Sequence, residues 1–550
     1  MLATKVIAMP EKVQPKINSL ESALHEWEKA VGRENVITDT AKISYYENTT
    51  FKTSQSVSAI LTPKNREEVQ ACVRIANEYK TPLYPVSKGY NWGYGSRVPA
   101  ESGCVVISLE RLNNITGYDE ELAYITVEPG TTFRQVYDFL KEKNSNLIAP
   151  AIGSTSAASL IGNALERGVG QGIYADRFQH CCNMEVVLPN GEFIQTGFGN
   201  MENVHSKNIF KWGVGPTIDG LFSQSNFGIV TRMTFWLSRK PAYFQAIFYT
   251  IKNNDQLEKA VDALRQLKLE GTLTTASIIS NSHRILSMKR QFPWAEVKDD
   301  NATLPQRYVD ELEKNALKGA VWVGDDAIMA PTKAIGKARA KRVKQLLGAV
   351  VDDMIIINDR VARIGTMLWR PIKALTGVDL RELMYFFYNS THLGIPMEKQ
   401  LSVCYWRKKT PVPANIDIDR DKCGVISLTP SVPLQGSHVI KVMGIMENIC
   451  RKYGFEPNLG LKTMSERHLI CVPQIIYDRE TPGQDKKAMD CYNEMLKTLT
   501  DEGYPPYRLG VQSMDKMTST SSEYVQLVNI LKSSIDPNNI ISPGHYGIGS

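Results

Sequence analysis

The chain has 550 residues, which is too long for a single core and indicates two or three domains. Its composition, 43% hydrophobic, 22% charged and 9% aromatic, excludes a disordered, collagen-like or coiled-coil protein. The net charge is only +6, from 64 Lys and Arg against 58 Asp and Glu, and no basic run is dense enough for a nucleic-acid-binding stripe.

Nine cysteines are a sparse and odd set, which argues against a disulfide framework. The eight histidines include no H-E-x-x-H motif, so no metal site is predicted. The N-terminus lacks the apolar core of a signal peptide, and no stretch stays apolar for roughly 18 residues. We therefore expect a soluble, cytoplasmic protein with no membrane span.

Short strands and helices alternate over the first two hundred residues. Val69, Cys72, Val73 and Ala76 recur at helical spacing and predict a helix over residues 66–80. Two later strands flank Asn190-Gly191, a strong hairpin turn. This pattern predicts an α+β domain with strands over residues 82–86, 104–109, 124–128, 184–188 and 193–196 and a helix that begins near Phe133.

The pattern of predicted helices and strands changes near Pro241 and again near Thr498. Between them lie long helical segments and apolar strands such as residues 425–428, while residues 292–307 are polar and aperiodic and predict a surface excursion. Residues 333–344 alternate Lys and Arg with Ala, Gly and Ile and predict the exposed face of a helix. A last helix, with Tyr524, Val528 and Leu531, is stopped by Asp536-Pro537.

Three glycine-rich segments carry the functional signal. Residues 87–96 follow a strand, and such a loop can turn successive backbone N–H groups into an anion-binding nest. Residues 162–172 contain four glycines that let a ligand approach the main chain, and residues 219–230 form a helix start that runs into a strand. No G-x-G-x-x-G follows a strand with an acidic residue downstream, so a dinucleotide-binding Rossmann unit is poorly supported. Each loop taken alone is compatible with a simple tight turn.

Taken in order, these motifs resemble those of the vanillyl-alcohol oxidase / p-cresol methylhydroxylase flavoprotein family. The resemblance implies a two-part FAD-binding domain, residues 1–240 and 499–550, with an inserted α+β substrate cap, residues 241–498. The segments that carry it are residues 91–95, 127–130, 162–172, 185–191, 219–230, 503–508 and 536–544.

The resemblance implies FAD contacts from the glycine-rich loops, with the 87–96 loop at the pyrophosphate. His545 takes the place of a family Lys or Arg near the flavin pyrimidine edge, where an imidazolium would favour anionic reduced flavin more than a neutral imidazole would. The expected cofactor-binding residues are Ser87, Lys88, Gly89, Tyr90, Asn91, Trp92, Gly93, Gly153, Ser154, Thr155, Gly162, Asn163, Gly168, Gly228, Ile229, Val230 and His545.

For the substrate, the resemblance implies that Tyr94, Tyr507 and Arg508 meet a phenol oxygen. A guanidinium and two phenolic donors would lower the pKa of that phenol. By the same resemblance, Asp176 is expected beside flavin N5, where a carboxylate can accept a proton from water; the alternative is an ion pair with Arg177. His468 matches a cap histidine that binds substrate.

Two family features are missing. Cys404 takes the place of the tyrosine that carries covalent flavin in one branch, and no histidine lies near Val425, where the other branch has one. We therefore expect mainly non-covalent FAD, with attachment through Tyr405 or Cys423 left open. A cap glutamate that acts as a base in one branch falls near Gly460, so that role is absent.

The resemblance implies an FAD-dependent oxidase or dehydrogenase that oxidises a para-substituted phenol. Hydride would leave the benzylic carbon for flavin N5 and a quinone methide would form. The alternatives are an enzyme of the same fold that oxidises a hydroxy acid or an alcohol, and an inactive flavin-binding module. Expected partners are the small phenolic substrate, a second copy in a homodimer, and an acceptor that could be oxygen, a quinone or a cytochrome.

Overall fold

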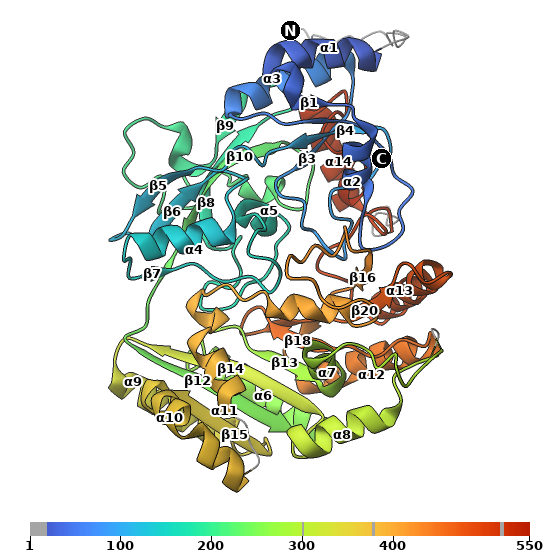
Figure 1. Ribbon diagram of the computed structural model, residues 1–550. Helices are drawn as coiled ribbons and strands as arrows, with labels where there is room; N and C mark the ends of the chain where they lie inside the picture. Colours follow the sequence, from blue (N-terminus) through green and yellow to red (C-terminus); the bar gives the residue numbers. More distant parts are fainter. Residues whose placement is uncertain (1–18, 300–301, 377–379, 517–521, 550) are drawn as a thin grey trace.

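The computed structural model describes residues 19–299, 302–376, 380–516 and 522–549. Its ribbon forms an upper body, which contains both the N-terminal and the C-terminal segments, and a lower body from the middle of the chain (Figure 1). Both helices and sheets are present, so the expected α+β class is confirmed. The boundaries near residues 240 and 498 stay predictions.

The upper body contains a four-stranded sheet of order β1-β2-β4-β3, in which β4 runs parallel to β2 and β3. Trp27 is buried between the covering helices and donates its Nε1–H to the Cys72 carbonyl at 3.0 Å. Asn65 caps the N-terminus of α3, which is the helix predicted over residues 66–80. The elements are α1 (Ser19–Val31), β1 (Val36–Ile37), α2 (Thr40–Glu47), β2 (Val57–Leu61), α3 (Arg66–Tyr79), β3 (Leu83–Val86) and β4 (Cys104–Ser108).

A five-stranded antiparallel sheet of order β5-β6-β10-β8-β9 completes this body. The hairpin predicted at Asn190-Gly191 joins β8 to β9, and Gly191 adopts a φ of 80° there. Thr132 and Gln135 form a capping box that begins α4. The elements are β5 (Ile115–Asp119), β6 (Tyr124–Val127), α4 (Phe133–Glu142), β7 (Leu147–Ile148), α5 (Leu160–Leu165), β8 (Cys181–Val187), β9 (Phe193–Gln195), β10 (Ile229–Trp236) and β11 (Ser238–Arg239).

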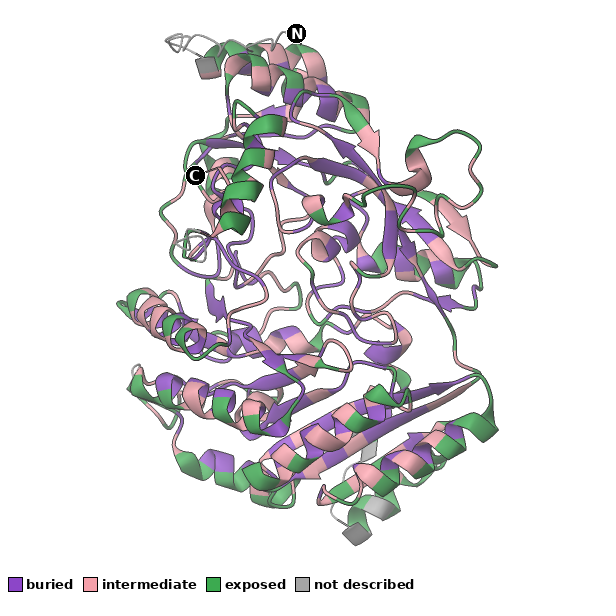
Figure 2. Ribbon diagram, turned by 180° about the vertical axis from the view of Figure 1, so that it is seen from behind, coloured by how far each residue is buried: buried purple, intermediate pink, exposed green. Residues whose placement is uncertain are grey.

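The lower body is built on a seven-stranded antiparallel sheet of order β15-β12-β14-β13-β18-β19-β17. Its core is a large apolar cluster from the sheet and the helices α6, α9, α12 and α13 (Figure 2). The strands are β12 (Tyr243–Ile251), β13 (Ile278–Asn281), β14 (Trp322–Ala330), β15 (Asp353–Asn358), β17 (Ser431–Pro433), β18 (Gly460–Thr463) and β19 (His468–Cys471), and β16 (Cys423–Ser427) pairs with β20 (Gln474–Asp478). The helices are α6 (Asn254–Leu269), α7 (Ser282–Lys289), α8 (Gln306–Ala316), α9 (Lys333–Leu346), α10 (Asp359–Thr376), α11 (Leu380–Tyr388), α12 (Gly436–Lys452) and α13 (Gln484–Asp501).

The prediction of a surface excursion over residues 292–307 is wrong at both ends of the segment. Phe292 and Leu304 are buried, and the Phe292 ring meets Trp406 edge-on with centroids 5.6 Å apart. Phe292 and Leu304, with the partly buried Trp294 and Val297, belong to one apolar cluster of the lower body, and their irregular spacing has no period that the sequence could reveal. The exposed helix predicted over residues 333–344 is present as α9.

The end of the chain returns to the upper body. Helix α14 (Glu523–Ile535) ends at Asp536 as predicted, and the Leu83 N–H donates to the Ile540 carbonyl at 2.7 Å. Lys532 is buried beneath this return and pairs with Asp536 at 2.6 Å. The last segment therefore closes the edge of the β1-β2-β4-β3 sheet.

The nine cysteines are all buried and free. Within residues 19–299, 302–376, 380–516 and 522–549, no helix is both long and apolar enough to span a membrane. The same residues contain no group of three or more His, Cys, Asp or Glu side chains that could hold a metal ion.

Candidate active site

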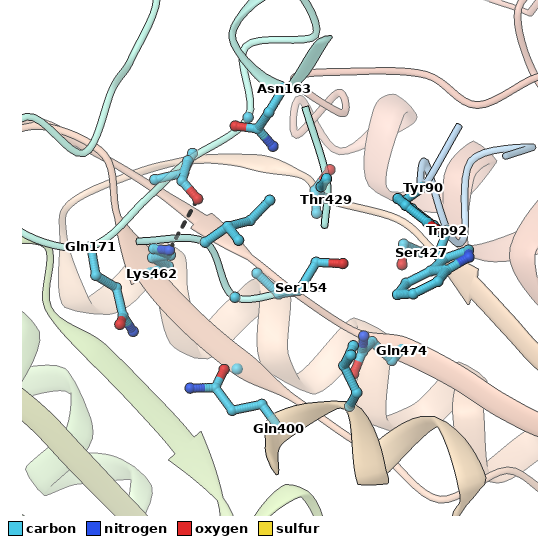
Figure 3. Close-up of a pocket in the computed structure, with 18 of the residues that line it drawn as sticks. Tyr90, Trp92, Ser154, Asn163, Gln171, Gln400, Ser427, Thr429, Lys462 and Gln474 are labelled. Atoms are coloured by element: carbon cyan, nitrogen blue, oxygen red, sulfur yellow. Dashed lines mark hydrogen bonds between the residues drawn. The ribbon is translucent and has the colours of Figure 1, made fainter. Parts of the chain in front are cut away.

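A cavity of about 1210 Å³ is lined by both bodies. The upper body contributes the loops at residues 87–92 and 152–169, the start of β10, and the late residues Tyr507, Arg508 and His545. The lower body contributes one face of its sheet, from β13, β14 and β18. In Figure 3, Lys462 and Gln171 lie on one side of this cavity and Thr429, Tyr90 and Trp92 on the other.

The loop after β3 has the form of an anion cradle. In the described part of the chain, the backbone N–H groups of residues 88–92 donate to no protein acceptor, whereas the next N–H, of Gly93, donates to Thr50 Oγ1 at 3.0 Å. Gly89 has a φ of 72°, and a Cβ there would collide with the Arg97 side chain. Five consecutive unpaired donors at a cavity wall fit the pyrophosphate of a dinucleotide cofactor such as FAD.

A second segment with free main-chain donors lies at residues 154–155, whose N–H groups have no acceptor among the described residues. Arg177 fixes the loops around it, because its guanidinium donates to Asn163 Oδ1 at 2.6 Å and to the Ala151 carbonyl at 2.8 Å. Burial lowers the pKa of Arg177 to about 9. No ion pair with Asp176 is found among the described residues, so Arg177 is a positioning residue that joins two loops of the cavity wall.

Most of the residues predicted to bind FAD line the cavity. Gly93 and Thr155 lie outside its lining, although both adjoin residues that contribute to it. Those in the lining are Ser87, Lys88, Gly89, Tyr90, Asn91, Trp92, Gly153, Ser154, Gly162, Asn163, Gly168, Gly228, Ile229, Val230 and His545.

Tyr94, Tyr507 and Arg508 come together at one end of the cavity. The Arg508 guanidinium lies 3.8 Å from the centroid of the Tyr94 ring and donates to Asn91 Oδ1. Arg508 Nε is buried without a partner in the described residues. An unpaired guanidinium donor beside two tyrosines is suited to a ligand that carries negative charge on oxygen.

Thr429 positions both tyrosines of this end. Its hydroxyl lies 3.1 Å from the Tyr94 hydroxyl, and its carbonyl accepts the Tyr507 N–H at 3.1 Å. Sequence reasoning missed Thr429, because a single threonine after a strand carries no signal of its own.

The electrostatics of this end keep the arginine charged and the tyrosines protonated. Burial raises the pKa of Tyr507 to about 12 against the opposing charge of Arg508, and burial also raises the pKa of Tyr94. Burial alone would lower the pKa of Arg508, but Tyr507, Tyr94 and Glu166 hold it above its ordinary value. The site therefore offers one fixed cation and two hydroxyl donors.

Glu166 is another residue of the cavity lining that was not predicted from the sequence. It accepts a hydrogen bond from the Tyr546 hydroxyl at 2.8 Å and lies 3.4 Å from His545 Nε2. Burial would raise the pKa of Glu166, but His545, Arg508 and Tyr546 lower it to about 2. A permanent carboxylate thus balances the positive charge behind Arg508.

Asp176 and His468 lie outside the lining of the cavity. Asp176 pairs with Val169, a lining residue, through an isolated β-bridge, and its carboxylate accepts the Gln179 N–H at 3.2 Å. His468 Nε2 lies 2.8 Å from Ser431 Oγ. Their roles toward water and substrate stay predictions.

The two residues left open for covalent attachment also lie outside the lining. The Tyr405 hydroxyl donates to Asp421 at 2.6 Å, and Cys423 is buried in β16. Cys404 does line the cavity, and burial raises the pKa of its thiol to about 12, so the thiol stays protonated.

Two further cations line the lower wall and were not singled out in the sequence. Gly460 and Lys462 are two residues apart on β18 and so lie on one face of the sheet. A Cβ at Gly460 would lie 3.4 Å from Arg284 Cδ and Nε, so the arginine side chain passes over this glycine. Two cations therefore adjoin Gly460, the position that a cap glutamate has in one family branch.

Comparisons with known proteins agree with this architecture. Residues 57–197 match the family model of an FAD binding domain. A Chondromyces crocatus protein named 1'-carboxy-chondrochloren decarboxylase is 42% identical over 96% of this chain and 97% of its own length. The 4-cresol dehydrogenase [hydroxylating] flavoprotein subunit of Pseudomonas putida is 28% identical over 96% and 95% of the two chains. A solved structure of p-cresol methylhydroxylase with substrate bound superposes with a TM-score of 0.85 at 27% identity over 98% of each chain.

The fold and the cavity define a flavin-dependent oxidoreductase, and FAD is its cofactor. The chain belongs to the vanillyl-alcohol oxidase / p-cresol methylhydroxylase family, as the resemblance implied.

Proposed function

We propose that this enzyme oxidises a para-substituted phenol at the benzylic carbon. The observation that carries the proposal is the convergence of Tyr94, Tyr507 and Arg508 at one end of the cavity that the FAD-binding loops line. Two relatives point the same way, because their names specify cresol.

The chain's residues would prepare the substrate for this reaction. Arg508 and the two tyrosine hydroxyls stabilise a phenolate oxygen, and the phenolate pushes electron density toward the para carbon. When bound, FAD supplies the two-electron acceptor that takes hydride from the benzylic carbon. The oxidised substrate is then a quinone methide.

The test is anaerobic reduction of the holoenzyme by 4-ethylphenol, followed by the loss of yellow flavin absorbance. We expect bleaching with 4-ethylphenol and none with 4-ethylanisole, whose methyl ether cannot form a phenolate. Bleaching by hydroxy acids alone would favour a hydroxy-acid enzyme of the same fold. Bleaching by no member of a panel of phenols, hydroxy acids and alcohols would favour a flavin-binding module.

A second candidate is oxidation coupled to decarboxylation, which the missing cap glutamate favours. With Gly460 in its place, the described residues that line the cavity from the lower body include no glutamate to activate water or remove a proton. If the substrate carries a carboxylate on the carbon next to the benzylic one, hydride loss first gives the quinone methide. The electron pair of the C–CO₂⁻ bond then forms a side-chain double bond, CO₂ departs and the ring returns to phenolate. No base is needed, and the 42% identical relative is named a decarboxylase.

The electron acceptor and the assembly remain proposals. The name of the Pseudomonas putida relative identifies it as one subunit of a larger assembly. We propose a homodimer that passes electrons to oxygen, a quinone or a cytochrome. Stopped-flow reoxidation of the reduced enzyme by each acceptor would choose among them.

A further inference from the structure

We propose that Lys462 and Arg284 form a binding site for a carboxylate on the para side chain of the substrate. The inference rests on the proposed function, since it names the class of phenol that the enzyme selects: a 4-hydroxyphenyl alkanoate rather than a neutral alkylphenol.

The two cations lie on one wall of the cavity. Lys462 extends from β18, and its Nζ donates to the Val169 carbonyl at 3.3 Å. Figure 3 shows Lys462 among the side chains that line the cavity. Arg284 extends from α7, and its Nη1 lies 3.2 Å from the Val472 carbonyl and 3.4 Å from Asn458 Oδ1. Both residues belong to the cavity lining.

Neither cation has an anionic partner within the described residues. Each is satisfied only by long contacts to neutral oxygens, whereas a paired guanidinium or ammonium usually lies within about 2.9 Å of a carboxylate oxygen. The nearby carboxylate on the same sheet is Asp325, two strands away across β13, and it lies 3.5 Å from His392. Two unpaired charges at a ligand cavity therefore lack the anion that would offset their desolvation.

Electrostatics support this reading of the geometry. Burial, together with the positive charges of Arg177 and Arg284, lowers the pKa of Lys462 to about 7. Burial also lowers the pKa of Arg284, to about 10. A bound carboxylate would reverse this effect at Lys462, so binding of the acid should take up a proton near pH 8.

The ligand is the substrate's carboxylate rather than the cofactor's pyrophosphate. The free N–H groups suited to phosphate lie on the loop at residues 88–92 of the upper body, whereas these cations lie on β18 and α7 of the lower body. A flat carboxylate matches one guanidinium fork with a lysine beside it. Inorganic phosphate serves as the competing anion in the test.

The experiment compares 3-(4-hydroxyphenyl)propanoate with its methyl ester, which keeps the phenol and removes the charge. Each compound is titrated calorimetrically into the oxidised holoenzyme under anaerobic conditions, which gives its dissociation constant. FAD reduction is monitored in parallel. A non-reacting pair, 4-hydroxybenzoate and its methyl ester, gives the same comparison without turnover. We expect the acid to bind at least tenfold more tightly than the ester at pH 6.5 and the preference to shrink above pH 8.

Variants assign the preference to the two residues. Lys462→Met and Arg284→Met should each reduce the ratio of ester to acid dissociation constants about tenfold, while Lys462→Arg should retain it. Lys337→Met, at an exposed position of α9, is the matched control for loss of one lysine. Gly460→Glu should give Arg284 an internal partner and also abolish the preference for acid.

Equal binding of acid and ester by the unmodified enzyme would overturn the inference, as would a preference that survives in both Met variants. Stronger competition by inorganic phosphate than by the acid would assign the site to phosphate instead and overturn the carboxylate. If no phenol reduces the flavin but the non-reacting acid still binds through Lys462, the proposed function fails and the anion site stands.

Discussion

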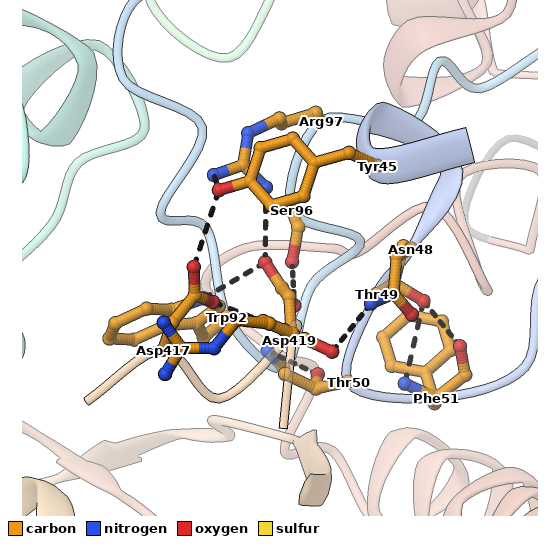
Figure 4. Close-up of polar contacts among 12 residues, drawn as sticks. Tyr45, Asn48, Thr49, Thr50, Phe51, Trp92, Ser96, Arg97, Asp417 and Asp419 are labelled. Atoms are coloured by element: carbon orange, nitrogen blue, oxygen red, sulfur yellow. Dashed lines mark hydrogen bonds and ion pairs between the residues drawn. The ribbon is translucent and has the colours of Figure 1, made fainter. Parts of the chain in front are cut away.

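One cation buried inside the fold and two cations at the cavity wall differ in what surrounds them. Arg97 lies 3.3 Å from the buried carboxylate of Asp419, which also accepts hydrogen bonds from Ser96 Oγ at 2.8 Å and Trp92 Nε1 at 3.0 Å (Figure 4). Lys462 and Arg284 meet only neutral oxygens within the described chain.

The presence or absence of an internal anionic partner distinguishes a structural cation from one that binds a ligand. The Arg97–Asp419 pair joins the loop after β3 to the segment before β16 and is complete without a ligand. A buried charge costs several kcal/mol unless it is paired. Where the fold pairs a cation internally, the charge stabilises the structure, and where it leaves two cations unpaired at a cavity, a ligand is the expected partner.

The largest effect should follow from breaking the complete pair. Asp419→Ala leaves Arg97 buried and unpaired, so we expect a loss of about 3–5 kcal/mol in the free energy of unfolding. Denaturant unfolding of the holoprotein measures this loss. Asp419→Asn, which can still accept from Ser96 and Trp92, should lose less, and an unchanged midpoint for Asp419→Ala would show that the pair contributes nothing.

At the phenolate end, Arg508→Ala should slow flavin reduction by about a hundredfold or more. Removing one converging donor from a dry site typically costs roughly 3–4 kcal/mol of barrier. Single-turnover reduction by 4-ethylphenol provides the rate, and FAD content and circular dichroism provide the controls. Arg508→Lys should rescue poorly, because an ammonium lacks the planar fork. A wild-type rate for Arg508→Ala with every phenol would refute phenolate stabilisation.

The unpaired Lys462 should affect the free energy of unfolding in the opposite sense to the paired Arg97. Lys462 has a pKa of about 7 in the fold and an ordinary value of 10.5, so between these pH values the unfolded chain binds a proton that the folded chain lacks. The free energy of unfolding therefore increases as the pH rises from about 7 to 10.5. Below pH 7 the folded protein bears the full cost of burying the charged Lys462.

Lys462→Met removes that penalty. Without substrate, we expect the variant to be more stable than the wild type by about 1 kcal/mol at pH 6, with the advantage shrinking toward pH 10. Thermal unfolding of the holoprotein at several pH values measures it. A variant that is less stable than wild type at pH 6 would mean that Lys462 stabilises the fold.

The smallest perturbation concerns the flavin itself. Since the Cys404 thiol is protonated and the Tyr405 hydroxyl is bonded to Asp421, we expect acid precipitation to release the FAD into the supernatant. A yellow pellet with a flavin-bearing peptide would contradict this expectation.

The sequence predicted what local patterns determine. The helix at Arg66–Tyr79, the hairpin at Asn190-Gly191 and the final stop at Asp536 each depend on neighbours within a few residues. The residues proposed to bind a phenolate were predicted from a family resemblance that covers nearly the whole chain. The number and the order of the matching motifs supported that inference, because no single glycine or tyrosine is specific enough to support it.

The remaining features depend on contacts between distant residues. No local pattern singles out Arg284 or Lys462; they come to one wall because β13, which leads directly into α7, pairs with β18. Likewise, Thr429 meets Tyr94 and Tyr507 because three segments from separate parts of the chain converge. Such juxtapositions leave no periodic trace.

The bond between Leu83 and the Ile540 carbonyl also constrains how the protein is made. Until the segment around Ile540 has been synthesised, β3 has an open edge, because that segment supplies the carbonyl that pairs with the Leu83 N–H. Arg508 likewise emerges after the lower body. We therefore expect FAD to bind stably only once the segments that contain Arg508 and His545 have been synthesised, and a chain truncated before Ile540 should have an exposed edge at β3.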